Sequence, residues 1–325
     1  MNIQTARAIL LALLLPVYAC NAQTQAAPTQ AGVETLHTPE IGGIKQYIEV
    51  KTNDIGKPIL LFLSGGPGSS MMNQAERYTS TLRQQFTIVQ WDQRDAGKTL
   101  KRNPSPTPPS LGQMENDTQE VIQFLRTTYG KDKIYLLGSS WGNVLGFHIV
   151  KNHPELLHAY FAVNPVVSQL ASEQELLDTL KRAYREHPVA STELATVRIP
   201  FVRDEDLFYL RKWLFHKEGK TFATSEAFKS NFLQWSKVWS PVWNEVMKID
   251  LPTTLGKVEV PVYFLVGAHD IQTSARITGD YFGKLQAPEK ELILFAHSGH
   301  QIHQDEPEKF QETIIRAVKP PPHRK

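Results

Sequence analysis

Cysteine is almost absent from this sequence of 325 residues, which contains only Cys20. An intrachain disulfide is therefore impossible, and metal sites built from several cysteines are excluded. An excess of charge of one sign is also lacking, because 35 basic residues face 33 acidic ones and the net charge is +2. This balance argues against a nucleic-acid-binding protein and against a strongly basic membrane-surface protein.

A long apolar run is lacking as well. The apolar segment over residues 8–15 is too short to cross a bilayer, but it has the length of a signal-peptide core. We predict a signal peptide over residues 1–22 with two alternative exits. One is a lipoprotein signal cleaved before Cys20, whose thiol then attaches the protein to a membrane; the other is cleavage after Ala19 or Ala22. Both predict export, as a periplasmic or membrane-anchored lipoprotein or as a secreted protein.

The rest of the chain has an ordinary globular composition, with 41% hydrophobic and 21% charged residues. A polar stretch over residues 23–40 predicts a flexible linker. Strand-like and helix-like segments then alternate, which predicts an α/β fold with a mostly parallel sheet and helices on both faces. The predicted strands cover residues 44–50, 58–63, 86–91, 134–137, 159–163, 260–266 and 291–295.

Helix boundaries follow from capping signals. Asp117 with Glu120 three residues later resembles a capping box, and Gly130 is a natural stop for the helix that begins there. Further helices are predicted over residues 274–285 and 307–318, the second ending at a proline-rich tail over residues 319–325.

One part of the chain lacks the alternation of strand-like and helix-like segments. Residues 166–257 are helical in pattern, are broken by prolines, and hold four of the six tryptophans. We therefore predict a helical cap inserted into a core made of residues 41–165 and 258–318. Three of the tryptophans recur every four residues, a spacing typical of a buried helix stripe that can also roof a pocket. They are Trp235, Trp239 and Trp243.

The segment over residues 138–142, Gly-Ser-Ser-Trp-Gly, follows a predicted strand and precedes an apolar helix. Ser140 has glycine at both the second preceding and the second following position, which Ser139 does not. A serine nucleophile held on a sharp strand-to-helix turn needs such glycines, because a Cβ there would collide with its neighbours. The alternative is an ordinary serine- and glycine-rich turn.

A serine nucleophile needs a base, and the base needs an orienting acid. Asp270 and His300 each follow a predicted strand, in the chain order serine, acid, histidine that this type of turn predicts. His297 and His303 compete for the role of base, and the three histidines have a spacing that can suggest a metal site. We predict neither metal nor cofactor, because no carboxylate-bearing helix accompanies them.

An oxyanion hole requires two converging backbone N–H groups. One is predicted at Trp141, directly after the serine. The other is predicted in the loop over residues 64–68, where Gly66 is the first choice and Gly65 the second, since Pro67 has no N–H.

Three motifs now stand in order, namely residues 64–68 (Ser-Gly-Gly-Pro-Gly), residues 92–99 (Asp-Gln-Arg-Asp-Ala-Gly-Lys-Thr) and residues 138–142. Over residues 41–318 the chain resembles the proline iminopeptidase branch of the α/β-hydrolase superfamily. It departs from the family pattern at Ser64, where the family has histidine, and at Asp95, where it has glycine.

The resemblance implies an α/β-hydrolase fold and a serine hydrolase that cleaves an N-terminal residue, proline among the candidates, from short peptides through an acyl-enzyme. A carboxylesterase or lipase acting on small or acyl esters is the alternative, and a non-catalytic binding protein on the same scaffold is a third hypothesis. The family holds the substrate's α-ammonium with acidic cap residues, and no such motif matches here. The cap carboxylates considered for this role are Glu173, Glu175, Glu193, Glu205 and Glu245.

Overall fold

The computed structural model describes residues 32–318, which belong to one compact unit. The predicted signal peptide with Cys20 and the tail over residues 319–325 lie outside the described residues. Within residues 32–318, no helix is both long enough and apolar enough to cross a membrane.

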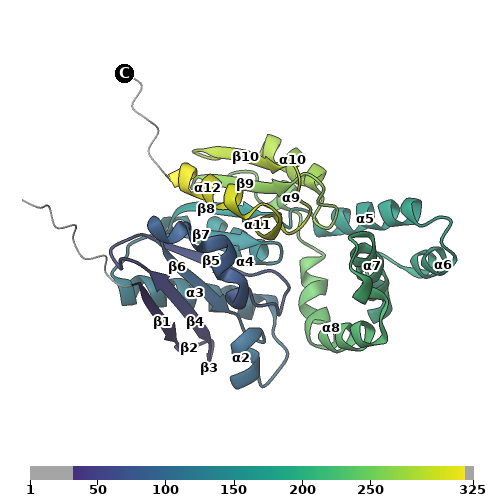
Figure 1. The fold of residues 1–325 in the computed structure, drawn as a ribbon, viewed down its shortest axis with the longest axis horizontal. Coiled ribbons are helices and arrows are strands. Elements are labelled where there is room, and N and C mark those ends of the chain that lie inside the picture. Colours follow the sequence, from purple (N-terminus) through teal and green to yellow (C-terminus); the bar gives the residue numbers. More distant parts are fainter. Residues whose placement is uncertain (1–31, 319–325) are drawn as a thin grey trace, which may run out of the picture. The chain divides into compact units, whose positions relative to one another are not determined.

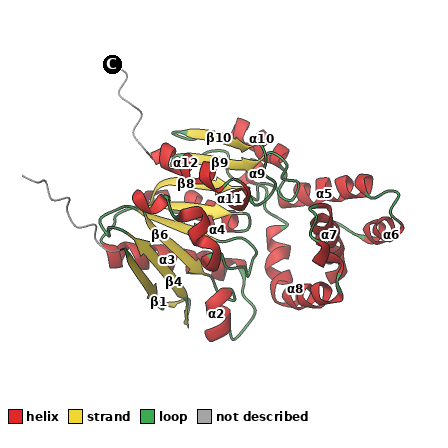
Figure 2. Cartoon of the chain, viewed as in Figure 1, coloured by secondary structure: helices red, strands yellow, loops and turns green. Residues whose placement is uncertain are grey.

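An eight-stranded sheet forms the centre of this unit (Figures 1 and 2). The strand order is β1-β4-β6-β5-β7-β8-β9-β10, antiparallel between β1, β4 and β6 and parallel in the rest. A short hairpin, β2 and β3, stands apart from it. The bounds are β1 Val33–His37, β2 Glu40–Ile41, β3 Ile44–Lys45, β4 Tyr47–Thr52, β5 Ile59–Leu63, β6 Thr87–Asp92, β7 Ile134–Ser139, β8 Leu157–Val163, β9 Val262–Gly267 and β10 Lys290–Phe295.

Helices cover both faces of the sheet, as the buried strand β5 makes clear. Its Leu61 and Leu63 join one apolar cluster and its Leu60 and Phe62 the other, because successive side chains of a strand point to opposite faces. Helices α3, α4 and α10 pack on the first face, and α1 and α12 on the second. The helices of the core are α1 Ala75–Thr79, α2 Gly97–Arg102, α3 Leu111–Tyr129, α4 Gly142–Asn152, α10 Ala275–Lys284, α11 Ile302–Asp305 and α12 Pro307–Val318.

Between β8 and β9 the chain is helical. Figure 1 shows α5, α6, α7 and α8 gathered at one side of the sheet. Leucines of α5, α6 and α7 form an apolar cluster of their own, so this helical region has its own small core. The elements are α5 Gln169–Ala183, α6 Pro188–Thr196, α7 Asp204–Lys217, α8 Glu226–Val246 and α9 Leu251–Thr254.

Three predictions made from the sequence were wrong in detail. The predicted linker over residues 23–40 contains β1, which pairs with β4 at the edge of the sheet. The predicted strand over residues 44–50 is divided at Gln46, whose N–H donates to the Pro39 carbonyl. The third concerns the helix predicted to start at Asp117.

That helix, α3, begins six residues earlier in the chain, at Leu111. Ser110 caps it by accepting a hydrogen bond from the Gln113 N–H at 3.2 Å. Asp117 lies inside the helix, fully buried, and forms a salt bridge with Arg94 at 2.9 Å. The acidic residue therefore serves a tertiary contact rather than a cap. Gly130 does end the helix, in the left-handed conformation at φ 60°.

Candidate active site

Ser140 lies on the sharp turn between β7 and α4, with φ at 52°. A non-glycine residue in this region is strained, and the neighbouring glycines allow the strain. A Cβ on Gly142 would stand 2.1 Å from the Leu63 carbonyl oxygen of the adjacent strand. Asn143 supports the turn, because its Nδ2 donates to the Ser140 carbonyl at 3.1 Å and to the Val163 carbonyl at 2.9 Å. The Ser140 side chain is thereby fixed at the carboxyl end of the sheet.

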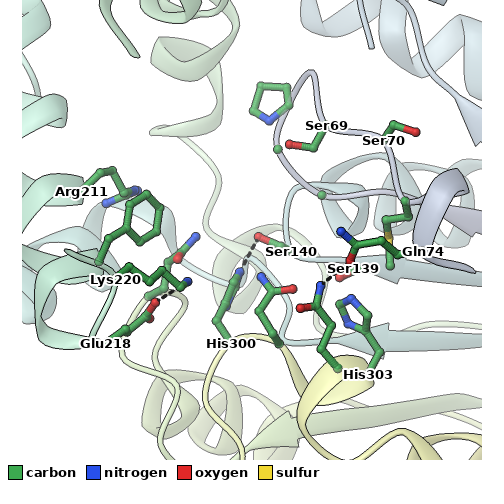
Figure 3. Close-up of a pocket in the computed structure, with 18 of the residues that line it drawn as sticks. Ser69, Ser70, Gln74, Ser139, Ser140, Arg211, Glu218, Lys220, His300 and His303 are labelled. Carbon is green, nitrogen blue, oxygen red and sulfur yellow. Dashed lines mark hydrogen bonds and ion pairs between the residues drawn. The ribbon is translucent and has the colours of Figure 1, made fainter. Parts of the chain in front are cut away.

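The structure brings Ser140, His300 and Asp270 together in one line of hydrogen bonds. His300 Nε2 lies 2.9 Å from Ser140 Oγ (Figure 3). On the other side of the ring, His300 Nδ1 lies 2.8 Å from Asp270 Oδ2. Asp270 follows β9 and His300 follows β10, two neighbouring parallel strands whose ends meet at the same edge of the sheet. This geometry allows an imidazole to take the serine proton while a carboxylate fixes the imidazole tautomer.

Asp270 is held as a carboxylate. Burial alone would raise the pKa of the Asp270 carboxyl, but His300 and hydrogen bonds from its neighbours hold that pKa below its usual range. The neighbours are Thr273, whose Oγ1 donates to Oδ2 at 2.8 Å, and Gln272, whose N–H donates to Oδ1 at 2.8 Å. The charged form needed to stabilise an imidazolium is therefore the one present at neutral pH.

The loops that carry the acid and the base are joined by Asn164. Its Nδ2 donates to the His300 carbonyl at 2.9 Å, and its Oδ1 accepts from the Gly267 N–H at 2.8 Å. Sequence reasoning did not single out Asn164. A signal was present, because Asn164 is a polar residue directly after the buried strand β8, the position where ligand-facing residues of α/β sheets gather.

The two competing histidines take other positions. His303 lines the same cavity but packs edge-on against Tyr78, with ring centroids 4.8 Å apart. Burial, with smaller contributions from His300 and Arg77, lowers the pKa of His303 from 6.5 to about 4, so it is neutral at pH 7. The backbone N–H of His297 donates to Glu306. Across residues 32–318, no three side chains of the metal-ligating types converge.

The loop after β5 faces the serine. A Cβ on Gly65 would lie 3.3 Å from Ser140 Cβ, so this glycine permits the close approach. Gly66 has φ at 121°, a conformation that side chains rarely adopt, and lines the cavity together with Gly65. The N–H groups of Gly66 and Trp141, predicted to form the oxyanion hole, thus belong to the two segments that flank Ser140.

Side chains from outside the loop connect these two segments. Gln93, directly after β6, donates to the Ser64 carbonyl at 3.2 Å and accepts from Trp141 Nε1 at 3.2 Å. From helix α8, Trp235 Nε1 donates to the Pro67 carbonyl at 2.9 Å. Trp239 lies so near Gly68 that a Cβ on that glycine would come within 2.7 Å of its Nε1. The helical region therefore contacts the loop over residues 64–68, which contains the predicted oxyanion donor Gly66.

The family departures also have a place in the structure. Asp95 adopts φ 54°, which explains why glycine suits this position, and its Oδ1 accepts from the Ser105 N–H at 2.9 Å. Ser64 Oγ donates to the Ser69 carbonyl at 3.0 Å, a hydrogen bond between the two ends of the loop that follows β5.

A cavity of about 430 Å³ opens above Ser140 and His300. This volume lies within the range of about 300–1,000 Å³ that is common for small-ligand sites. The helical region supplies one wall, and Figure 3 shows its Arg211, Glu218 and Lys220 across from Ser140 and His300. That wall is formed by Leu207, Arg211, Phe215, Glu218, Lys220, Phe232, Trp235 and Trp243. Of the tryptophan stripe, Trp235 and Trp243 thus reach the cavity, whereas Trp239 is buried in the core.

The acidic residues considered for an amine do not reach this cavity. Within the described residues, none of the five lines it. Glu173 is buried against Arg211, Glu193 pairs with Lys212, and Glu175 pairs with Arg276. The cap carboxylate that does line the cavity is Glu218, which was not among the candidates and whose Oε2 lies 2.8 Å from Lys220 Nζ.

Comparison with known proteins identifies the class. Residues 58–307 match the family described as alpha/beta hydrolase fold, and the chain belongs to this family. A probable aminopeptidase of Bacillus subtilis, YbaC, is 28% identical over 315 residues, covering 90% of this chain and 98% of the relative. A proline iminopeptidase of Heyndrickxia coagulans is 22% identical over 286 residues, covering 84% and 94%.

The fold agrees with that comparison. The crystal structure of a proline iminopeptidase-related protein from Thermus thermophilus superimposes with a TM-score of 0.62 at 20% identity, covering 88% of this chain and 97% of that one. The chain is thus an α/β-hydrolase enzyme of the proline iminopeptidase-like kind.

Proposed function

We propose that the protein is a serine aminopeptidase of the proline iminopeptidase type, which releases the N-terminal residue of short peptides. The observation that carries the proposal is the line of hydrogen bonds that runs from Ser140 through His300 to Asp270, of which Ser140 and His300 line the cavity. The aminopeptidase and proline iminopeptidase relatives support the choice of substrate class.

In this proposal Ser140 Oγ attacks the carbonyl carbon of the first peptide bond, and its proton passes to His300 Nε2. Asp270 stabilises the imidazolium, while the N–H groups of Gly66 and Trp141 bind the oxyanion. The C–N bond then breaks, and His300 gives its proton to the leaving amine. Water, deprotonated by His300, releases the acyl group and restores the serine hydroxyl.

Two measurements test this proposal. A fluorophosphonate probe is expected to label Ser140, with Ser140→Ala unlabelled, which separates an enzyme from a binding protein on the same scaffold. A panel of aminoacyl-naphthylamides is expected to be hydrolysed, with the proline derivative among the substrates. Turnover of simple esters with none of the naphthylamides would contradict the aminopeptidase assignment.

A carboxylesterase is the second candidate function. It is favoured by the apolar side chains of the cavity wall, since Phe215, Phe232, Trp235 and Met71 suit an acyl chain. The same substrate panel decides between the two, because an esterase would prefer esters of increasing acyl length over every aminoacyl amide.

We also propose that the mature protein is exported, on the strength of the N-terminal sequence pattern alone. Mass spectrometry of the mature N-terminus tests this. A lipid-modified Cys20 is expected for a lipoprotein and an N-terminus after Ala19 or Ala22 for a soluble exported form, whereas an unprocessed Met1 would contradict both.

A further inference from the structure

One face of helix α7 forms part of the cavity wall opposite the catalytic centre. Leu207, Arg211 and Phe215 follow each other at spacings of four residues, which places them on one side of the helix, and Glu218 follows its last residue. Leu207 and Phe215 are apolar, as a simple lid would require. Arg211 is the exception, because it is a charged side chain that is only 5% exposed and yet borders the cavity.

Arg211 is held rigidly from behind. Its Nη1 donates to Glu173 Oε2 at 2.7 Å, and its Nη2 donates to Glu173 Oε1. Gln169 Nε2 also donates to Oε1, at 2.6 Å, and the Arg211 guanidinium lies 5.8 Å from the centre of the Trp243 ring. Glu173 is fully buried, so Arg211 stands between it and the cavity. The guanidinium has five N–H donors and gives two hydrogen bonds to Glu173, which leaves donors for another acceptor.

A buried ion pair of this kind is weak evidence of a role in stability. Burying two charges costs several kcal/mol of hydration, and replacing a buried ion pair by apolar side chains is often neutral or stabilising. Leu176, Leu180, Leu210 and Leu214 supply apolar packing between α5 and α7 beside this pair. A fixed guanidinium at a cavity wall is instead suited to recognise a carboxylate.

The hydrogen-bond donors near Arg211 favour an anion as the ligand. The oxygens of Glu173 already accept three hydrogen bonds from Arg211 and Gln169. Lys220 also lines the cavity and holds the Glu218 carboxylate at 2.8 Å. The wall thus presents two cationic side chains and one carboxylate, and the buried cation has the fixed orientation.

We propose that this cavity selects substrates that carry a carboxylate, bound by Arg211 with Lys220 at the rim. The proposal rests on the proposed function, in which Ser140 cleaves short peptides. The carboxylate then has two sources: the free C-terminus of a short peptide on the leaving side, or an acidic side chain on the acyl side.

Three matched substrate pairs test the selection and separate its sources. The tripeptide Pro-Gly-Gly against its C-terminal amide reports a carboxylate on the leaving side, and glutamyl- against glutaminyl-naphthylamide reports one on the acyl side. The p-nitrophenyl esters of succinate and butyrate supply the same contrast without a peptide bond. In at least one pair, kcat/KM is expected to favour the anionic member by about tenfold or more, as a charge-assisted hydrogen bond provides.

Arg211→Gln is expected to abolish this preference, mainly through KM of the anionic member, and Arg211→Lys to retain part of it. Lys220→Gln at the rim is expected to reduce the preference by roughly two- to fivefold, in line with an exposed ion pair. Lys212→Gln is the matched control: Lys212 is the next residue of α7, pairs with Glu193 and does not line the cavity. It is expected to keep the wild-type preference.

The outcomes are distinct. Equal kcat/KM within all three pairs for the wild-type enzyme overturns the carboxylate proposal, even if Arg211→Gln fails to fold. An Arg211→Gln protein that folds, judged by its thermal melt, and keeps the wild-type ratio also overturns it. Preference for the succinate ester together with no peptide hydrolysis upholds carboxylate selection and contradicts the aminopeptidase. Hydrolysis of the tripeptides and naphthylamides with equal kcat/KM within all three pairs upholds the aminopeptidase and contradicts carboxylate selection.

Discussion

The sheet core and the helical cap over α5–α9 build the same cavity in different ways. The core supplies Ser140, Asp270 and His300, each on a short loop directly after a parallel strand, and fixes them through hydrogen bonds to the backbone. The cap supplies a wall whose charged side chains are held by ion pairs: Arg211 of α7 pairs with Glu173 of α5, and Lys220 pairs with Glu218. In the proposed function, chemistry depends on residues at strand ends, and in the further proposal substrate selection depends on contacts between helices. Substitutions on the two sides of the cavity separate these two contributions.

The largest effect is expected at the nucleophile. Ser140→Ala removes the atom that attacks the carbonyl, so kcat is expected to fall by about 10⁵-fold or more. Hydrolysis of the best aminoacyl-naphthylamide, followed with active-site labelling, checks this. Residual activity within tenfold of wild type would show that another residue carries the reaction.

The acid of the core comes next. Asp270→Asn keeps the size of the side chain but no longer stabilises the imidazolium, and the His300 tautomer becomes wrong for accepting the Ser140 proton. A fall in kcat of roughly 10³- to 10⁴-fold is expected. Because the pKa of Asp270 lies below its usual range, the carboxylate also stabilises the fold above the unfolded-state pKa, and this contribution is lost as pH falls through the folded-state pKa.

Urea denaturation at pH 7 and in acid, on wild type and Asp270→Asn, measures that second effect. The wild type is expected to lose more of its unfolding free energy on acidification than the variant does. An equal loss in both proteins would contradict the link between the Asp270 charge and stability.

His303 provides a pH effect on the core side of the cavity. Its pKa is about 4 in the folded protein against 6.5 normally, so between these values the unfolded chain binds a proton that the folded protein does not. The unfolding free energy therefore decreases as pH falls from 6.5 to 4, by about 3 kcal/mol in full. His303→Gln is expected to remove this part of the pH slope in urea titrations, and an unchanged slope would assign it to other groups.

The sequence predicts the site residues of the sheet core better than the wall formed by the helical cap. Ser140 was identified because both its glycines lie within two residues, and Asp270 and His300 because each follows a recognisable apolar strand. Local pattern sufficed for these placements. It failed for β1, whose five residues lie in an otherwise polar stretch and become a strand only through pairing with β4.

Longer-range contacts were missed for a physical reason. Asp117 reads as a helix start, but its carboxylate meets Arg94, 23 residues away, and the true cap is Ser110. The pairing of Glu173 with Arg211 spans 38 residues and the contact of Trp235 with Pro67 spans 168. No periodicity or spacing reports such partners, because they are set by how the helices pack. The predicted catalytic groups were therefore accessible from the sequence, whereas the cap wall was not.

The smallest of these effects is expected where core and cap meet. Trp235 of α8 holds the Pro67 carbonyl at 2.9 Å, next to the predicted oxyanion donor Gly66. Trp235→Phe keeps an aromatic ring but removes the N–H, and the loss of one hydrogen bond of about 1 kcal/mol corresponds to a roughly fivefold lower kcat. KM is expected to change little, because the loop acts on the transition state rather than on the bound substrate.

Affinity for a peptidyl boronate, which forms a tetrahedral adduct on a serine, gives a readout that a loss of general stability would not move. It is expected to fall by the same factor as kcat in Trp235→Phe. Trp213→Phe is the matched control, since Trp213 Nε1 donates to Glu193 within the cap and does not line the cavity. If both variants weakened boronate binding equally, the cap would act through its overall packing. If only Trp235→Phe does so, a single cap side chain positions the core loop over residues 64–68. The cap then contributes to the chemical step as well as to substrate selection.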